Sequence, residues 1–123
     1  MSTSSRGSAR ERQVRKHLEY QGWAVTRGAG SHGCADLWAA KQEARGLDAV
    51  NVRFPFKVDA FLTTLRLIQV KTDKAGPFAH FRPADRKELL ALAAQTGGSA
   101  ELWHWPANKP CRIYLPDEWP VAR

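Results

Sequence analysis

One stretch of the sequence decides the fold: LRLIQVK, residues 65–71. Its leucines and the β-branched residues Ile68 and Val70 predict a buried strand. Because successive side chains of a strand point to opposite faces, Gln69 and Lys71 leave it on one face and Val70 points into the core. An amide buried without a partner costs about 1–3 kcal/mol. Gln69 therefore indicates a ligand or a hydrogen-bond donor near the end of this strand.

A second predicted strand, ADLWAA at residues 35–40, carries Asp36 near its start. If the two strands are antiparallel, the start of this one lies beside the end of the first, and Asp36, Gln69 and Lys71 converge. Carboxylate and amide oxygens, together with the backbone carbonyl of Val70, are ligands for a hard cation. We expect Mg²⁺ at this point, for which Mn²⁺ can substitute. Lys71 would stabilise negative charge developing on a bound phosphate.

The rest of the chain alternates between helical and strand patterns. A helix is predicted from Ser8, whose hydroxyl would form a capping box with the Glu11 carboxylate, to a stop at Gly22. The polar residues 1–6 are predicted to be a disordered arm. The other predictions are a strand at 23–27, a glycine-rich turn at 28–33, a charged loop at 41–49, a bent edge strand or two short strands at 50–62, a helix at 84–96, strands at 100–105 and 111–115, and an irregular tail from 117. This order predicts an α/β fold, in which residues 1–123 form a single domain with a central mixed β-sheet flanked by helices.

The charge of the chain favours a polyanionic partner. Its 123 residues include 19 Lys and Arg against 12 Asp and Glu, which gives a net charge of +7. Lys and Arg that contact phosphates gain affinity by releasing counterions. Basic residues dominate the first helix and the strand after it, where Glu11 and Glu19 are the acidic residues. The candidate DNA contacts from this region are Arg6, Arg10, Arg12, Arg15, Lys16 and Arg27.

Several other classes of protein are excluded by composition. The two cysteines, Cys34 and Cys111, are too few for a disulfide scaffold and lack the paired spacing of a zinc site. No apolar run approaches the roughly 18 residues that a membrane-spanning helix needs. The polar N-terminus does not have the pattern of a secretory signal. We expect a soluble, cytoplasmic protein without a membrane partner.

The pattern Asp36…Gln69-Val70-Lys71 resembles the D…(E/Q)-x-K core of the PD-(D/E)XK nucleases. Its surroundings resemble the archaeal-type Holliday junction resolvases in order and spacing. The residues that carry this resemblance are GSARER at 7–12, GWAVTR at 22–27, AGS at 29–31, DL at 36–37, the strand end at 67–71, and the helix at 86–98 that ends in Gly-Gly. Residues 42–64 depart from the family pattern and look like an insertion.

The resemblance implies a restriction-endonuclease-like fold and a homodimer that cuts opposed strands of a four-way DNA junction. Subunit pairing would use the helix at 84–96 and the apolar segment at 50–62. The resemblance assigns roles to single residues: Glu11 as a metal-site acid, Asp36 and Gln69 as metal ligands beside the Val70 carbonyl, Lys71 as the catalytic lysine, Ser31 at the scissile phosphate, and Arg12 and Arg27 as DNA contacts or supports of the site. The family usually has Glu where this chain has Gln69. Because ligand charge sets much of the affinity for the metal, that affinity should be lower here.

Simpler interpretations and other functions stay open at this point. Glu11 could serve only the capping box, Asp36 could close a turn, and Lys71 could be a solvated residue at a strand end. The chain could also be a repair or restriction nuclease of the same fold that acts on other DNA, or an RNA-processing nuclease. A catalytically weakened DNA-binding module, which has lost the family's glutamate, is a further alternative.

Overall fold

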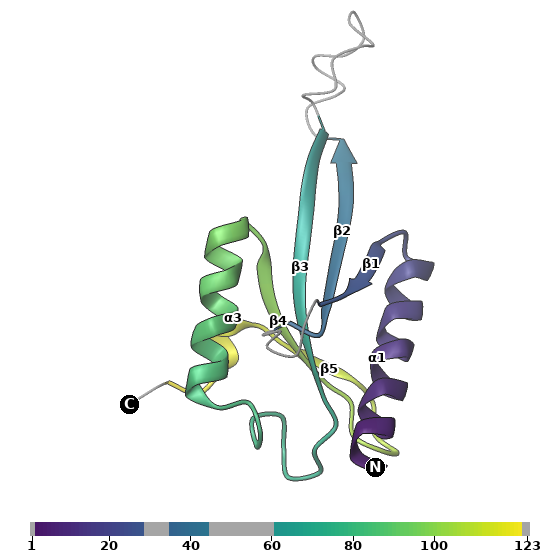
Figure 1. Ribbon diagram of the computed structural model, residues 1–123, viewed down its shortest axis with the longest axis vertical. Coiled ribbons are helices and arrows are strands. Elements are labelled where there is room, and N and C mark those ends of the chain that lie inside the picture. The colour runs from purple at the N-terminus through teal and green to yellow at the C-terminus, as the bar shows by residue number, and fades with distance from the viewer. Residues whose placement is uncertain (1, 29–34, 45–60, 122–123) are drawn as a thin grey trace, which may run out of the picture.

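The protein is built around one mixed sheet with a helix on each face (Figure 1). The computed structural model describes residues 2–28, 35–44 and 61–121. The elements are α1 (Ser2–Tyr20), β1 (Ala24–Arg27), β2 (Leu37–Ala44), β3 (Phe61–Lys71), α3 (Pro83–Thr96), β4 (Ser99–His104), β5 (Arg112–Tyr114) and the short 3₁₀ helix η2 (Pro116–Glu118). The five strands lie in the order β1-β2-β3-β4-β5, and only β3 and β4 are parallel. The predicted fold class is therefore confirmed.

Alternation along β3 divides the apolar core into two layers. Ile68 and Val70 pack on one face of the sheet with Val14 and Leu18 of α1. Leu67 packs on the other face in a cluster that contains Leu89 and Ala93 of α3. Val14, Leu18, Leu67 and Ile68 have no exposed surface. Both helices are thus fixed to the sheet by the side-chain period of a single strand.

Helix α1 begins at Ser2, whereas the sequence predicted a start at Ser8. Residues 2–20 form one helix. The predicted capping box at Ser8 is therefore wrong, and so is the predicted disordered arm over residues 2–6. Gly7 and Ser8 lower helix propensity by at most about 1 kcal/mol each, which does not end a helix that neighbouring residues extend. Because Ser8 lies inside the helix, the Glu11 side chain is not used by a cap and can take another partner.

The β2–β3 hairpin is longer than the sequence predicted. β2 continues to Ala44, through the start of the predicted charged loop, and β3 begins at Phe61. β1 pairs with β2 only as far as Ala40, and β4 pairs with β3 only from Arg66. The outer part of the hairpin therefore projects beyond the rest of the sheet (Figure 1). Residues 45–60, with most of the apolar alternation at 50–62, lie outside the described residues.

The C-terminal half follows its predicted pattern closely. Helix α3 begins at Pro83 and ends at Thr96, and the next residue, Gly97, has the left-handed φ of 76° that favours glycine. The predicted strands near 100–105 and 111–115 are β4 and β5. The tail is less irregular than predicted, because η2 precedes a buried Trp119 that contacts Phe81 edge to face. No helix in the described part of the chain is long and apolar enough to cross a membrane.

Candidate active site

Asp36 lies where β2 meets the end of β3. Its N–H donates a hydrogen bond to the Ile68 carbonyl at 2.8 Å, and its carboxylate Oδ2 accepts one from the Val70 N–H at 2.8 Å. The strands are antiparallel with Leu37 opposite Ile68, so Asp36 lies opposite Gln69. The antiparallel arrangement assumed from the sequence is confirmed. Oδ1 of Asp36 accepts no hydrogen bond from the residues that the structure describes.

The backbone of β3 adds a second oxygen at this point. In an extended strand the N–H and C=O of one residue point to the same edge. The Val70 N–H points to Asp36, so the Val70 carbonyl faces the same side, beyond the start of β2. The Lys71 carbonyl faces the opposite edge, where it accepts a hydrogen bond from the Trp105 N–H at 2.9 Å. The carbonyl of Val70 is therefore on the edge of β3 that the Asp36 carboxylate also occupies, which is the edge a shared ligand would use.

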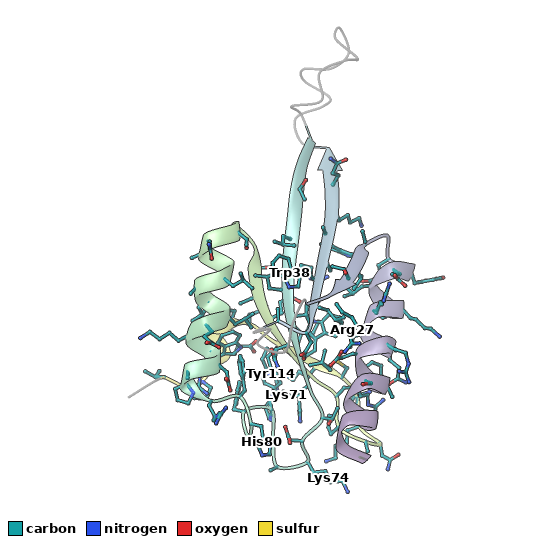
Figure 2. All side chains as sticks on the ribbon, in the orientation of Figure 1. Arg27, Trp38, Lys71, Lys74, His80 and Tyr114 are labelled. Carbon is teal, nitrogen blue, oxygen red and sulfur yellow. The ribbon has the colours of Figure 1, made fainter. Side chains whose placement is uncertain are left out.

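Gln69 and Lys71 lie on the face of β3 that α3 covers, as Leu67 does. Both side chains are half-buried. Lys71 lies close enough to lower the pKa of Asp36, although burial outweighs this effect and the net pKa of Asp36 is raised. Figure 2 shows Lys71 at the end of β3 and Arg27 on the α1 side of the same end of the sheet. The positive charges of Lys71 and Arg27 therefore both lower the pKa of Asp36, against the larger effect of burial.

Glu11 reaches the site from the middle of α1. Its carboxylate lies 3.6 Å from Nε of Arg27, and 19% of its side chain is exposed. Its pKa is raised by burial first and by the negative charge of Asp36 second, while Arg27 lowers it. A cavity of about 230 Å³ adjoins Glu11, lined by Arg12, Arg15 and Arg27 among others. Two carboxylates on different elements therefore repel each other beside a basic cavity.

This donor set fits a hard divalent cation. No group of three His, Cys, Asp or Glu side chains in the described residues could hold a metal by itself. Glu11 and Asp36 supply two carboxylates that are costly to ionise where they are, and a cation would remove that cost. The carbonyl of Val70 and the amide of Gln69 can complete an all-oxygen set. With neutral Gln69, the set carries two negative charges.

The predicted DNA contacts fall into two groups. Arg12, Arg15, Lys16 and Arg27 are exposed, although Arg15 pairs with Glu19 at 3.2 Å. Arg10 instead makes contacts within the protein. Its guanidinium donates hydrogen bonds to the Pro106 carbonyl at 3.1 Å and to the Gln13 side chain at 2.8 Å, and it lies 4.7 Å from the ring of Trp105. Ser31 and the side chain of Arg6 lie outside the described residues, so their predicted roles stay predictions.

Two supports of the site were not predicted from the sequence. His104 lies opposite Lys71 in the β3–β4 register, and its Nε2 bonds the Asp73 carbonyl at 2.7 Å. The Trp105 N–H also donates a hydrogen bond to the Lys71 carbonyl. Together the two bonds hold the chain on both sides of Thr72. The alternation of Trp103, His104 and Trp105 indicated only a strand, because nothing local in the sequence reveals a partner about thirty residues away.

Comparison with protein families matches residues 2–53 to the archaeal Holliday junction resolvase (Hjc) family. These residues include Glu11, Arg27 and Asp36. The matched segment is less than half of the 123-residue chain, and over it the chain is similar to this family. The match supports the predicted resemblance to this family and the predicted class of enzyme, the resolvase-type nucleases.

The fold of the chain is similar to a solved structure of Hjc, a Holliday junction resolvase from the archaeal hyperthermophile Archaeoglobus fulgidus. The TM-score is 0.62 at 20% identity, and the match covers 91% of this chain and 80% of the Archaeoglobus chain. At this identity the likeness establishes the fold, which is restriction-endonuclease-like. A search of curated protein sequences finds no match.

Proposed function

We propose that this protein is a structure-selective endonuclease that resolves four-way DNA junctions by metal-dependent phosphodiester hydrolysis. One observation carries the proposal: Asp36 is hydrogen-bonded to the backbone of Val70, its charge raises the pKa of Glu11, and Lys71 and Arg27 lower the pKa of Asp36 itself. Acidic groups for a cation and basic groups for a phosphate therefore meet at one point. The family match over residues 2–53 supports the choice of a branched DNA substrate.

We propose that Glu11, Asp36, Gln69 and the Val70 carbonyl hold Mg²⁺, or Mn²⁺ in its place. When bound, such a cation polarises a phosphate and lowers the pKa of water. Asp36 is already oriented for this role, because its hydrogen bond to Val70 fixes the carboxylate before any ligand arrives. Glu11 would approach from the α1 side of the sheet and Gln69 from the α3 side.

Lys71 is the proposed catalytic cation. No carboxylate of the described residues lies within ion-pair distance of its ammonium group, which is therefore available to a phosphate oxygen. An ammonium group placed beforehand stabilises charge that develops on the phosphate during hydrolysis. Ser31 is proposed to lie at the scissile phosphate, on the strength of the family resemblance.

The exposed basic residues of α1 and β1 are proposed to hold the DNA backbone. Arg12, Arg15 and Arg27 line the cavity beside Glu11, and Lys16 lies on the same helix. Contacts of this kind position DNA without reading its sequence, which suits recognition of a branched shape. Arg6 is included in the proposal, and Arg10 contributes chiefly through its contacts with Pro106 and Trp105.

A homodimer would place two such sites on opposed strands of one junction. We propose that pairing uses α3, where 43% of Leu90 is exposed, and the segment at 50–62. The proposed location of the enzyme is the cytoplasm.

The decisive experiment compares cleavage of a labelled four-way junction with cleavage of a linear duplex that has the same arm sequences. We expect cleavage of the junction only, with a dependence on Mg²⁺ that saturates. Equal rates on both substrates would contradict junction selectivity and favour a repair or restriction nuclease of the same fold. Sedimentation of the protein with and without junction tests the dimer separately.

Gln69 favours one alternative, a weakened DNA-binding module. An amide provides a single neutral oxygen where the family usually has a carboxylate, so the cation site has lost charge. Such a module would bind the junction without cutting it at any Mg²⁺ or Mn²⁺ concentration. Restoration of cutting by Gln69→Glu would show that only this residue limits the site.

A further inference from the structure

Helix α1 lies between two hollows, of which the proposed cation site uses only one. The residues of α1 that line the first hollow, beside Glu11, are Ser8, Glu11, Arg12 and Arg15. The residues of α1 that line the second, which has a volume of about 450 Å³, are Ala9, Arg10, Arg12, Gln13 and Lys16. Apart from Arg10, each set has the i, i+3, i+4, i+7 spacing of one stripe along a helix. The two stripes therefore lie on either flank of α1, and Arg12, on the ridge between them, lines both hollows.

The outer wall of the second hollow is the turn that joins β4 and β5, which contributes Ala107. Figure 1 shows this turn beside the N-terminal half of α1. The Pro106 carbonyl accepts hydrogen bonds from Nη2 of Arg10 at 3.1 Å and from the Lys109 N–H at 3.3 Å. The guanidinium of Arg10 also lies 4.7 Å from the ring of Trp105. The wall is therefore attached to α1 before any ligand arrives.

The chemistry of the second hollow fits an anion. Its basic lining residues are Arg10, Arg12 and Lys16, and none of its described lining residues is acidic. Gln13 is exposed, and because its Oε1 accepts the hydrogen bond from Arg10 at 2.8 Å, its amide can still donate through Nε2. The remaining walls are the methyl groups of Ala9 and Ala107, which offer no aromatic surface on which a base could stack. The lining therefore fits phosphate groups better than bases.

We propose that the second hollow binds the phosphate backbone of a second arm of the junction, while the first hollow takes the arm that is cut. The inference rests on the proposed function and adds how the protein distinguishes branched DNA from linear DNA. The two backbones would lie on either flank of α1, separated by about 10–12 Å, the width of a helix with its side chains. Arg12 would lie between them, and Gln13 and Lys16 would contact only the second arm.

A single linear duplex does not offer the same pair of backbones to α1. The major groove of B-form DNA is about 12 Å wide and 8.5 Å deep, so a helix must enter it to lie between the two backbones. The flanks of α1 are covered, by Arg27 and Leu37 on one side and by the β4–β5 turn at Ala107 on the other. Two separate arms can reach the hollows from different sides without such penetration.

The proposed pairing of subunits through α3 leaves both hollows accessible. Helix α1 packs on one face of the sheet through Val14 and Leu18. Helix α3 packs on the other face through Leu89 and Ala93. DNA and the second subunit are therefore assigned to opposite sides of the protein.

The test is a fluorescence-anisotropy titration of the full-length protein, in EDTA, with a labelled four-way junction and with a linear duplex that has the same arm sequences. Gln13→Glu places a carboxylate in the second hollow from α1, and Ala107→Glu places one there from the β4–β5 turn. Each should weaken binding of the junction about tenfold and binding of the duplex less than about twofold. If Gln13→Glu weakens both DNAs equally, or neither, the proposal is wrong.

Gln21→Glu is the matched control, because it makes the same substitution at an exposed position that lines neither hollow. It should leave the ratio of the two affinities unchanged. A loss of junction preference as large as that of Gln13→Glu would show an effect of net charge alone and would overturn the proposal. Lys16→Gln should reduce the magnitude of the salt slope by about 0.9 for the junction and leave the slope for the duplex unchanged.

Cleavage of the junction with Mg²⁺ is measured beside the titrations, so that the two proposals can fail separately. If Gln13→Glu and Ala107→Glu reduce the preference for the junction but the wild type cuts no DNA, only the proposed hydrolysis is wrong. If the wild type cuts the junction and Gln13→Glu keeps the full preference for it, only this inference is wrong. Urea unfolding of each variant verifies that the fold is kept, and Gln13→Glu decides the outcome if Ala107→Glu disturbs the turn.

Discussion

The carboxylate of Asp36 accepts a hydrogen bond from the backbone N–H of Val70 at 2.8 Å. This single contact joins two segments that are 34 residues apart in the chain. It replaces the next bond of the β2–β3 ladder with a bond to a side chain, and so holds an acidic group at the point where the strands separate. Because the bond uses backbone as the donor, the position of Asp36 does not depend on the identity of residue 70.

Asp36→Asn should abolish metal-dependent cleavage while junction binding changes little. The amide can still accept the Val70 hydrogen bond through its oxygen, so the fold is kept, but the charge that attracts a cation is lost. Single-turnover cleavage and gel-shift titration of the same four-way junction measure the two effects. Asp117→Asn, at an exposed position in η2, is the matched control and should cut at the wild-type rate.

Lys71→Ala should reduce the rate of cleavage by at least about a hundredfold, the range seen when one group that stabilises transition-state charge is removed. Affinity for the junction should fall only slightly, because one phosphate contact among several is lost. The control is Lys74→Ala, an exposed lysine of the following loop. Wild-type cleavage by the Lys71 variant would remove this residue from the proposed mechanism.

Mg²⁺ should stabilise the folded protein in a pH-dependent manner through Glu11 and Asp36. Both carboxyl groups have a raised pKa, so folding without a cation is favoured while they are protonated, and this contribution is lost as pH rises through the raised folded pKa values. A cation binds the ionised forms, so the increase in Tm on addition of Mg²⁺ should be largest at neutral pH and should vanish as pH falls through those values.

Thermal melts over a pH series with and without Mg²⁺ measure this linkage. Glu11→Gln removes one of the two repelling charges, so its Tm without metal should exceed that of the wild type at neutral pH, and its response to Mg²⁺ should be smaller. If Mg²⁺ raised the Tm of the wild type equally at all pH values, the cation would bind elsewhere. The same conclusion would follow if Mg²⁺ raised the Tm of the double variant Glu11→Gln/Asp36→Asn as much as that of the wild type.

The arginines of α1 should differ in what they contribute. Arg12→Gln should reduce the magnitude of the salt slope of junction binding by about 0.9 for the phosphate contact it loses, with little effect on stability. Arg10→Gln should instead lower stability, because it loses the bond to the Pro106 carbonyl and the stacking on Trp105. Binding measured at several salt concentrations, together with urea unfolding, distinguishes the two. Identical salt slopes for both variants would contradict this division.

Glu101→Ala should destabilise the fold by about 3 kcal/mol, the lower end for a broken buried pair, because it leaves the partly buried Arg66 guanidinium without its partner. Glu101 forms a bidentate pair with Arg66, with both bonds at 2.8 Å, and accepts a hydrogen bond from the Trp103 indole at 2.9 Å. The exposed pair between Arg112 and Glu118 is the control, and Glu118→Gln should cost less than about 1 kcal/mol. Urea unfolding measures both values.

Much of the candidate site could be predicted because it depends on local periodicity. The two-residue spacing of Gln69 and Lys71 put their side chains on one face whatever the strand packs against. The amide in an apolar run marked the strand end, and the predicted antiparallel pairing placed Asp36 beside it, as the register shows. Helix α3 could also be predicted, because Pro83 and Gly97 end it through backbone geometry alone.

The errors arose where distant contacts outweigh local signals. The Ser8–Glu11 pattern indicated a capping box, but the helix extends to Ser2, and Glu11 lies beside Arg27 instead. Nothing in the sequence distinguished Arg10 from the other basic residues of α1, which were predicted to contact DNA. In the structure its guanidinium donates a hydrogen bond to the Pro106 carbonyl. A capping motif is worth about a kilocalorie per mole, which neighbouring helical residues and packing can exceed.

The sequence by itself determined the class of fold, the strand that carries Gln69 and Lys71, and the kind of oxygen and ammonium groups that the site contains. Periodicity and backbone restriction act over a few residues, so they can be read directly from the order of side chains. Only the tertiary structure decided that Glu11 lies beside Arg27, that Asp36 accepts a hydrogen bond from the Val70 N–H, and that Arg86 is buried. These relationships depend on strand register and on the docking of helices, which are set by the joint packing of residues far apart in the chain.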